Sequence, residues 1–256
     1  MPQLNFVKMK ISEGIADIIF NRPKHNVFNT DMIKEINVLL ENLAEDNTLK
    51  CVVFRGEGPS WCAGVDVADH EPELVDQMIN NFNHMFELID GFDIPLIAAV
   101  HGACLGGGME AAIACDIIIA ARKAVFGQPE IKLGFFPPYA AIRLPQMVGV
   151  AKAIEICTTG KRYSADEARS MGLVSKTVED EQFNDEVDKM IHEIQVNSPL
   201  IIRLNKRAVK QHLGMDFSKA LPSAGDMFLN TLMKTEDTLE GIKSFYEKRK
   251  PEWKNR

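Results

Sequence analysis

The sequence predicts an α/β protein, in which buried parallel strands are covered by helices on both faces and a helical C-terminal portion follows. Three observations predict this fold class. The middle of the chain repeats the order strand, turn, helix, strand, its strands are too apolar to face water, and the pattern after Gly149 is almost wholly helical. The break at Asn197-Ser198-Pro199 is the expected domain boundary, between a core of residues 1–197 and a helical region of residues 198–256.

The first half of the chain alternates strand and helix patterns. Residues 4–11 and 16–20 predict two strands around the turn at Glu13-Gly14. Residues 30–45 predict an amphipathic helix, because apolar side chains recur there at intervals of three and four, with Asn29 or Thr30 as its N-cap. Further strands and a helix are expected at residues 51–54, 74–89 (the helix), 95–100 and 117–121.

The second half of the chain carries helical patterns with capping residues at their starts. Ser164 is the clearest of these N-caps. The helices are expected at residues 150–159, 164–171, 183–196, 199–212, 218–234 and 238–248. No internal repeat interrupts this series.

Composition and charge exclude several classes of protein. Hydrophobic residues make up 46% and charged residues 25% of the chain, as in globular proteins, and the net charge of −7 argues against a nucleic-acid binder. The five cysteines form no CxxC pair and have no histidine at metal-ligand spacing, so we interpret them as core residues in a reducing compartment and expect no metal site. No signal peptide is visible, and the most apolar segment contains carboxylates and a glycine triplet that a membrane span would not tolerate. We therefore expect a soluble, cytoplasmic protein.

A glycine triplet, Gly106-Gly107-Gly108, precedes an alanine-rich helical stretch. Glycine allows another molecule to approach the backbone closely, and the first N–H groups of a helix have no intrahelical partner. The positive end of the helix dipole favours an oxygen that becomes negative during a reaction. For the triplet alone, a tight turn that requires positive φ is an equally good interpretation.

A second turn of small residues lies upstream, in the segment WCAGVD at residues 61–66, after a predicted strand and its loop. Taken alone this segment is a weak signal. Two turns that each present N–H groups after a core strand form a candidate oxyanion hole. The two turns together are stronger evidence for such a site than either turn alone.

Two glutamates flank these turns in the sequence. Glu110 falls within the first turn of the helix after Gly107 and has apolar neighbours, so we expect its carboxyl to be partly buried, with a raised pKa. Glu130 follows FGQP at residues 126–129; an isolated glutamate there could also cap a helix or lie at an exposed tip. Two carboxyls that converge on one apolar pocket can add water across a double bond, one as base toward the water and one as proton donor.

No other catalytic motif competes with this interpretation. The chain has no GxSxG, no GxxxxGK[ST] and no HExxH. Asp116 opens a buried strand and is best interpreted as a structural hydrogen-bond acceptor. His84 and His101 are interpreted as packing or hydrogen-bonding residues.

Five segments together resemble the crotonase family of acyl-CoA enzymes, over essentially the whole chain. They are NRP at 21–23, WCAGVD at 61–66, HGACLGGGMEAAIACD at 101–116, FGQPEIKLG at 126–134 and EGIKSFYEKRKPEW at 240–253. The glycine-rich segment and FGQPE are specific to the family when they occur together in this order.

The resemblance implies a crotonase-like spiral of ββα repeats, with a C-terminal helical trimerisation region and a homotrimer or homohexamer as the assembly. It implies an acyl-CoA thioester as substrate and no cofactor beyond the CoA of that substrate. The catalytic residues that it implies are Glu110 and Glu130 as the acid/base pair, with the N–H groups of Val65 and Gly107 as the oxyanion hole. The substrate-binding residues that it implies are Lys24 and His25 along the CoA nucleotide, Lys248 near a phosphate, Phe136, Pro138 and Tyr139 at the acyl pocket, and also Ala63 and Asp66.

The sequence departs from ordinary hydratases of the family just after Glu130. Those have a turn resembling GxxPGxGGTQRL, whereas residues 134–144 read GFFPPYAAIRL, one residue shorter and without the inner glycines. Proline and tyrosine stiffen and fill a region expected to border the acyl pocket, which predicts a flat, compact acyl group; neutral drift at a helix start is the alternative. This version of the loop is similar to that of hydratases of alicyclic dienoyl-CoA esters. The specific prediction is therefore 1,4-addition of water to cyclohexa-1,5-diene-1-carbonyl-CoA.

Other functions stay open on the sequence alone. Within the family, the alternatives are a short-chain 2-enoyl-CoA hydratase and an enoyl-CoA isomerase, which needs only one acid/base group. Outside enzymes, the alternative is a CoA- or RNA-binding member with little activity. The presence of both glutamates favours hydration, and the net negative charge of the chain argues against RNA binding.

Overall fold

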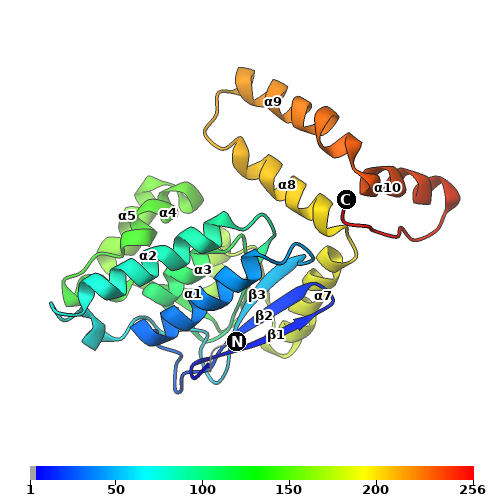
Figure 1. Ribbon diagram of the computed structural model, residues 1–256. Coiled ribbons are helices and arrows are strands. Elements are labelled where there is room, and N and C mark those ends of the chain that lie inside the picture. The colour runs from blue at the N-terminus through cyan, green and yellow to red at the C-terminus, as the bar shows by residue number, and fades with distance from the viewer. Residues whose placement is uncertain (1–3) are drawn as a thin grey trace.

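A six-stranded sheet forms the centre of the computed structural model, which describes residues 4–256 (Figure 1). Its strand order is β1 (Val7–Ser12), β2 (Ile15–Phe20), β3 (Cys51–Gly56), β4 (Leu96–Val100), β6 (Ile117–Ala121) and β9 (Lys176–Val178). Strand β1 runs antiparallel to β2, and all the other pairings are parallel. The predicted parallel sheet is thus confirmed from β2 onward.

Helices cover both faces of this sheet, which explains its continuous apolar runs. All five residues of β4 are buried. One face packs against α1 (Thr30–Ala44), α2 (Val75–Gly91) and α3 (Gly107–Ala114). The other face packs against α7 (Phe183–Gln195), through a separate cluster that includes Phe183, Val187 and Ile191.

A smaller three-stranded sheet positions the turns of the site. Its order is β5 (Ala103–Leu105), β7 (Val125–Gly127) and β8 (Arg162–Ser164). Strand β5 leads into the glycine triplet, and β7 leads into the 3-10 helix η2 (Pro129–Leu133), which carries Glu130. These three-residue strands were not predicted, because a run so short shows no alternation. The pattern after Gly149 was predicted as almost wholly helical, and β8 and β9 are the two short strands that this prediction missed.

The remaining helices of the core differ in how well their signals predicted them. Helix α5 (Val150–Thr159) matches its prediction, and Ser164 caps α6 (Ala165–Ser170) in a full capping box with Glu167. Helix α4 (Pro138–Val148) was not delimited in the sequence, because prolines at its start and at position 145 obscure the pattern. Proline is tolerated at position 138 because it occupies the first turn, where its missing N–H has no helical partner.

Three helices extend away from the α/β core: α8 (Pro199–Gln211), α9 (Phe217–Asn230) and α10 (Glu236–Glu247) (Figure 1). Helix α8 is fixed to the core by Lys206, whose Nζ lies 2.6 Å from Asp116 Oδ2 and 2.8 Å from the Ile94 carbonyl oxygen. Asp116 also accepts from the Leu96 N–H at 2.8 Å, which confirms its structural role.

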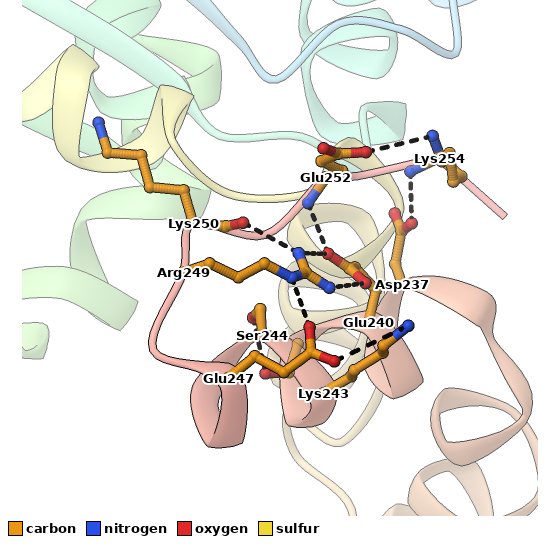
Figure 2. A network of polar contacts seen from close by, with 10 residues as sticks. Asp237, Glu240, Lys243, Ser244, Glu247, Arg249, Lys250, Glu252 and Lys254 are labelled. Atoms are coloured by element: carbon orange, nitrogen blue, oxygen red, sulfur yellow. Dashed lines mark hydrogen bonds and ion pairs between the residues drawn. The ribbon is translucent and has the colours of Figure 1, made fainter.

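The C-terminal segment after α10 folds back along that helix (Figure 2). The Arg249 guanidinium binds the carboxylates of Glu240 and Glu247, and Asp237 Oδ1 accepts from the Lys254 N–H at 2.6 Å. Asp237 is fully buried and also accepts from the hydroxyl of Ser198, the N-cap of α8. The basic tail is therefore part of the folded helical region. Among residues 4–256, no helix has the length and apolar character needed to cross a bilayer.

Candidate active site

A cavity of about 640 Å³ opens between α2, the start of α3, and the segment from η2 to α4. Glu110 and Glu130 both line it, together with Ala63, Val65 and Gly107. Apolar side chains form most of its wall; they include Val75, Met78, Ile79, Phe82, Phe86, Leu133 and Phe135. Turns that follow β3, β5 and β7 therefore meet at one apolar cavity, as the sequence predicts for the two N–H-presenting turns and both carboxyls.

The backbone N–H of Val65 points away from the chain segment that contains Phe28. Phe28 pairs with Val65 in a parallel bridge, in which the Phe28 N–H donates to Gly64 and the Phe28 carbonyl accepts from Asp66, both at 2.8 Å. In such a bridge the residue between the two partners directs its own N–H to the opposite side. Val65 itself lines the cavity.

Gly107 is the first residue of α3, so its N–H has no partner within the helix. A Cβ at Gly107 would lie 2.4 Å from Val65 Cγ2 and 3.0 Å from Phe82 Cζ. Only glycine therefore allows the start of α3 to lie against the Val65 side chain, and both residues line the cavity. The pair has the composition of an oxyanion hole.

The other two glycines of the triplet are also required by close contacts. Gly106 has a φ of 55°, and a Cβ there would lie 2.7 Å from Glu130 Oε1. A Cβ at Gly108 would lie 2.5 Å from the Cys62 carbonyl oxygen. The positive-φ interpretation is confirmed at Gly106, whereas the close contacts are with other segments of this chain, and approach of a substrate to the triplet stays a prediction.

Glu110 is buried under the N-terminus of α4. Its Oε1 accepts from the Ala140 N–H at 2.9 Å. Burial raises the pKa of Glu110 to about 7, the hydrogen bond from Ala140 lowers it, and the charge of Glu130 raises it. The predicted burial and raised pKa are confirmed.

Glu130 lies in η2, against the glycine triplet. Burial raises its pKa to about 7 as well. The Gln128 side chain is completely buried beside it. With its amide NH₂ turned toward the surrounding acceptors, Gln128 donates to Glu130 Oε1 at 3.0 Å, to Glu130 Oε2 at 3.1 Å and to the Gly106 carbonyl at 3.3 Å. Gln128 thereby orients the carboxylate.

Aromatic rings close the cavity beside Glu110. Tyr139 stacks on Phe86 with ring centroids 4.0 Å apart and an interplanar angle of 20°. Pro138 and Phe136 also line this part, although Phe136 is 71% exposed. The shortened turn after Glu130 therefore does border the cavity, as expected from its proline and tyrosine.

Four predicted substrate-binding residues lie outside the cavity lining. The Asp66 carboxylate caps η1 (Val67–His70) through the Ala68 N–H and pairs with Arg22 at 3.0 Å, so this residue shapes the loop, and its contact with substrate stays a prediction. His25 Nδ1 lies 2.9 Å from Ser60 Oγ, and Lys24 precedes it outside the cavity. Lys248 is the C-cap of α10, one of the helices that extend away from the α/β core (Figure 1), and it does not line the cavity. Contacts of Lys24, His25 and Lys248 with CoA stay predictions.

Sequence reasoning missed three residues of the site. Gln128 stood within the FGQPE segment, and its place two residues before Glu130 was the available signal. Phe82 and Phe86 read as ordinary apolar positions of the predicted helix at residues 74–89. Among the described residues, no cluster of three or more histidine, cysteine or acidic side chains could hold a metal ion.

The fold and the site together define a class of α/β protein in which two carboxyls and a glycine-rich helix start line one apolar cavity. The sequence profile of the enoyl-CoA hydratase/isomerase family matches residues 10–256, and the chain belongs to this family. It is 34% identical to the short-chain-enoyl-CoA hydratase of Clostridium acetobutylicum, over 99% of this chain and all of that one. It is 32% identical to the cyclohexa-1,5-dienecarbonyl-CoA hydratase of Thauera aromatica, over 92% of this chain and 91% of that one.

The solved structures give the same result for the fold. The enoyl-CoA hydratase of Bacillus anthracis superposes with a TM-score of 0.93 at 29% identity, over 98% of this chain and all of that one. The predicted crotonase-like fold is confirmed, and the chain is a hydro-lyase of this family.

Proposed function

We propose that this enzyme hydrates a conjugated acyl-CoA thioester between Glu110 and Glu130. The observation that carries the proposal is the burial of both carboxyls in one cavity, which raises each pKa to about 7. Near neutral pH such a pair holds one proton between its two members. One carboxylate can then act as base while the other carboxyl acts as acid.

In the proposed reaction, the ionised carboxylate takes a proton from water as the water oxygen bonds to the β-carbon. The π electrons move toward the thioester oxygen, which the N–H groups of Val65 and Gly107 stabilise as an enolate. The protonated carboxyl then gives its proton to carbon, and the carbonyl re-forms. One water is added, and neither a metal nor an organic cofactor is consumed.

We propose cyclohexa-1,5-diene-1-carbonyl-CoA as the specific substrate. The Phe86–Tyr139 stack and Pro138 support a flat, short acyl group, because they fill the space that a long flexible chain would need. The four carbons C2, C1, C6 and C5 form the conjugated diene. The hydroxyl would bond to C2, which is β to the thioester, and the proton would bond to C5, leaving a C1–C6 double bond.

Turnover of two substrates tests this proposal. The purified enzyme is assayed with the cyclic dienoyl-CoA and with crotonyl-CoA, by the loss of conjugated absorbance and by product mass. The proposal expects a higher kcat/KM for the diene. Rapid hydration of crotonyl-CoA with none of the diene would instead identify a short-chain 2-enoyl-CoA hydratase, a function that the relative in Clostridium acetobutylicum supports.

We also propose that the helical region of residues 198–256 assembles the chain into a homotrimer or a homohexamer in the cytoplasm. Helix α9 buries none of its residues within the chain, and Phe245 and Tyr246 of α10 are each 79% exposed. Apolar side chains gathered in this way are typical of subunit interfaces. Light scattering coupled to size-exclusion chromatography tests the assembly: Phe245→Glu should lower the mass of the particle, and a wild-type monomer would refute it.

A further inference from the structure

The entrance of the cavity holds a histidine that neither the acid/base pair nor the oxyanion hole uses. His70 ends the 3-10 helix η1 and lines the cavity. Its Nδ1 lies 3.0 Å from the Asp66 carbonyl oxygen. A carbonyl can only accept, so Nδ1 carries the hydrogen and donates it. This bond fixes the orientation of the imidazole relative to the loop that presents the Val65 N–H.

The His70 ring contacts an aromatic ring from the opposite side of the entrance. Its centroid lies 4.9 Å from that of Phe135, with an interplanar angle of 31°. Phe135 follows η2, and its N–H donates to the Glu130 carbonyl at 3.1 Å. The contact therefore joins the element that carries one oxyanion donor to the element that carries one acid/base carboxyl.

The His70–Phe135 contact lies at the entrance of the cavity, away from the contacts that fix the base of the cavity. At the base of the cavity, backbone pairing with Phe28 fixes Val65, and hydrogen bonds from Gln128 fix the Glu130 carboxylate. At the entrance, the neighbouring side chains Val67 and Leu133 are 58% and 60% exposed. The His70–Phe135 contact thus lies at the open end of the cavity. The Val65 loop and the Glu130 segment, which it joins, are otherwise fixed at the base of the cavity.

We propose that the His70–Phe135 contact is a clasp that holds the oxyanion loop and the Glu130 segment at a fixed separation over the bound acyl group. It rests on the proposed function, because the separation matters only when the thioester and the carboxyl act on one substrate. His70 and Phe135 are positioning residues: neither takes or gives a proton. Misplacement of reacting groups by about 1 Å can lower a rate by about a hundredfold, so loss of the clasp should lower kcat more than it raises KM.

A double-mutant cycle tests the clasp. His70→Ala and Phe135→Leu should each lower kcat about tenfold, and the double variant should be about as slow as either single one, because both changes remove the same contact. The conservative substitution Phe135→Tyr keeps the aromatic ring, so this variant should retain nearly the wild-type kcat. Ala68→Ser is the control, since Ala68 is an exposed residue of the same 3-10 helix that does not line the cavity, and this variant should leave kcat unchanged.

A second readout is independent of turnover. The ring of Phe135 should shift the NMR resonance of the His70 Hε1 proton, and Phe135→Leu should remove that shift while Ala68→Ser keeps it. A wild-type resonance without a ring-current shift would overturn the clasp, and so would a double variant whose loss in kcat equals the product of the single losses. If the wild-type enzyme hydrates neither test substrate, the proposed function fails, and the resonance still reports whether the contact exists.

Discussion

Adding one methyl group at Gly107 should separate the two oxyanion donors. The Cβ of an alanine at this position would lie 2.4 Å from Val65 Cγ2, whereas carbon atoms in contact lie about 3.5–4.0 Å apart. Val65 is β-branched and stiff, and Phe82 Cζ blocks the other side at 3.0 Å. The start of α3 and the Val65 loop must therefore move apart by about 1 Å.

A shift of this size takes one N–H out of hydrogen-bonding range of the thioester oxygen. Loss of one oxyanion donor costs about 2.7–4 kcal/mol, which is a decrease in kcat of about 10²- to 10³-fold. Gly107→Ala should show this decrease in steady-state hydration assays. Overpacking should also lower the free energy of unfolding by about 1–3 kcal/mol, measured by denaturant titration.

A second substitution separates the geometric effect from a general loss of folding. Val65→Ala removes Cγ2 but keeps the backbone N–H, so it should have nearly wild-type kcat. Combined with Gly107→Ala, it should restore most of the lost activity, because the clashing atom is gone. Gly91→Ala is a control at the end of α2, where an added Cβ meets nothing within 4 Å. A fully active Gly107→Ala variant, or a double variant no faster than it, would refute the proposed oxyanion hole.

Three further predictions follow from the buried charges. Glu110→Gln and Glu130→Gln should each lower kcat for hydration by about 10²- to 10⁴-fold while calorimetry still shows binding of a CoA thioester; a large effect of only one of them would indicate an isomerase. Glu110 should destabilise the fold at high pH: its pKa rises from 4.5 to about 7 on folding, so the stability present below pH 4.5 is lost as the pH rises through 7, by up to about 3 kcal/mol. Glu110→Gln should therefore raise Tm more at pH 8 than at pH 5, and an equal effect at both would contradict the raised pKa. Lys206→Ala should lower the free energy of unfolding by about 2–3 kcal/mol, less than the 3–5 kcal/mol of a fully buried pair because Asp116 stays about one-third exposed; an unchanged denaturation midpoint would contradict the anchoring of α8.

The parts of the fold that sequence reasoning predicted are those with long, periodic patterns. Helix α1 was predicted with the correct first residue, because Asn29 is a strong cap that accepts from the Met32 N–H. The short strands β5, β7 and β8 were missed, because pairing with distant segments stabilises three-residue strands and leaves no local periodicity.

The residues of the candidate site likewise divide into those that the local sequence predicted and those that it did not. Gly107, Glu110 and Glu130 were predicted because their local surroundings are unusual, with glycines or carboxyls among apolar residues. The ion pair of Asp66 was not predicted, because its partner Arg22 is 44 residues away in the chain. Phe86 was missed for a similar reason, since only the folded chain brings it against Tyr139.

The altered turn after Glu130 has two effects that act together. Pro138 begins α4, and the Ala140 N–H that donates to Glu110 belongs to the same first turn. The residues that narrow the acyl end of the cavity thus also begin the helix whose N–H groups hold the carboxyl. A helix N-terminus stabilises negative charge, so it opposes the effect of burial on the pKa of Glu110. A more closed cavity alone would raise that pKa further and leave the carboxyl protonated, whereas the donor at its edge keeps it able to exchange a proton near neutral pH.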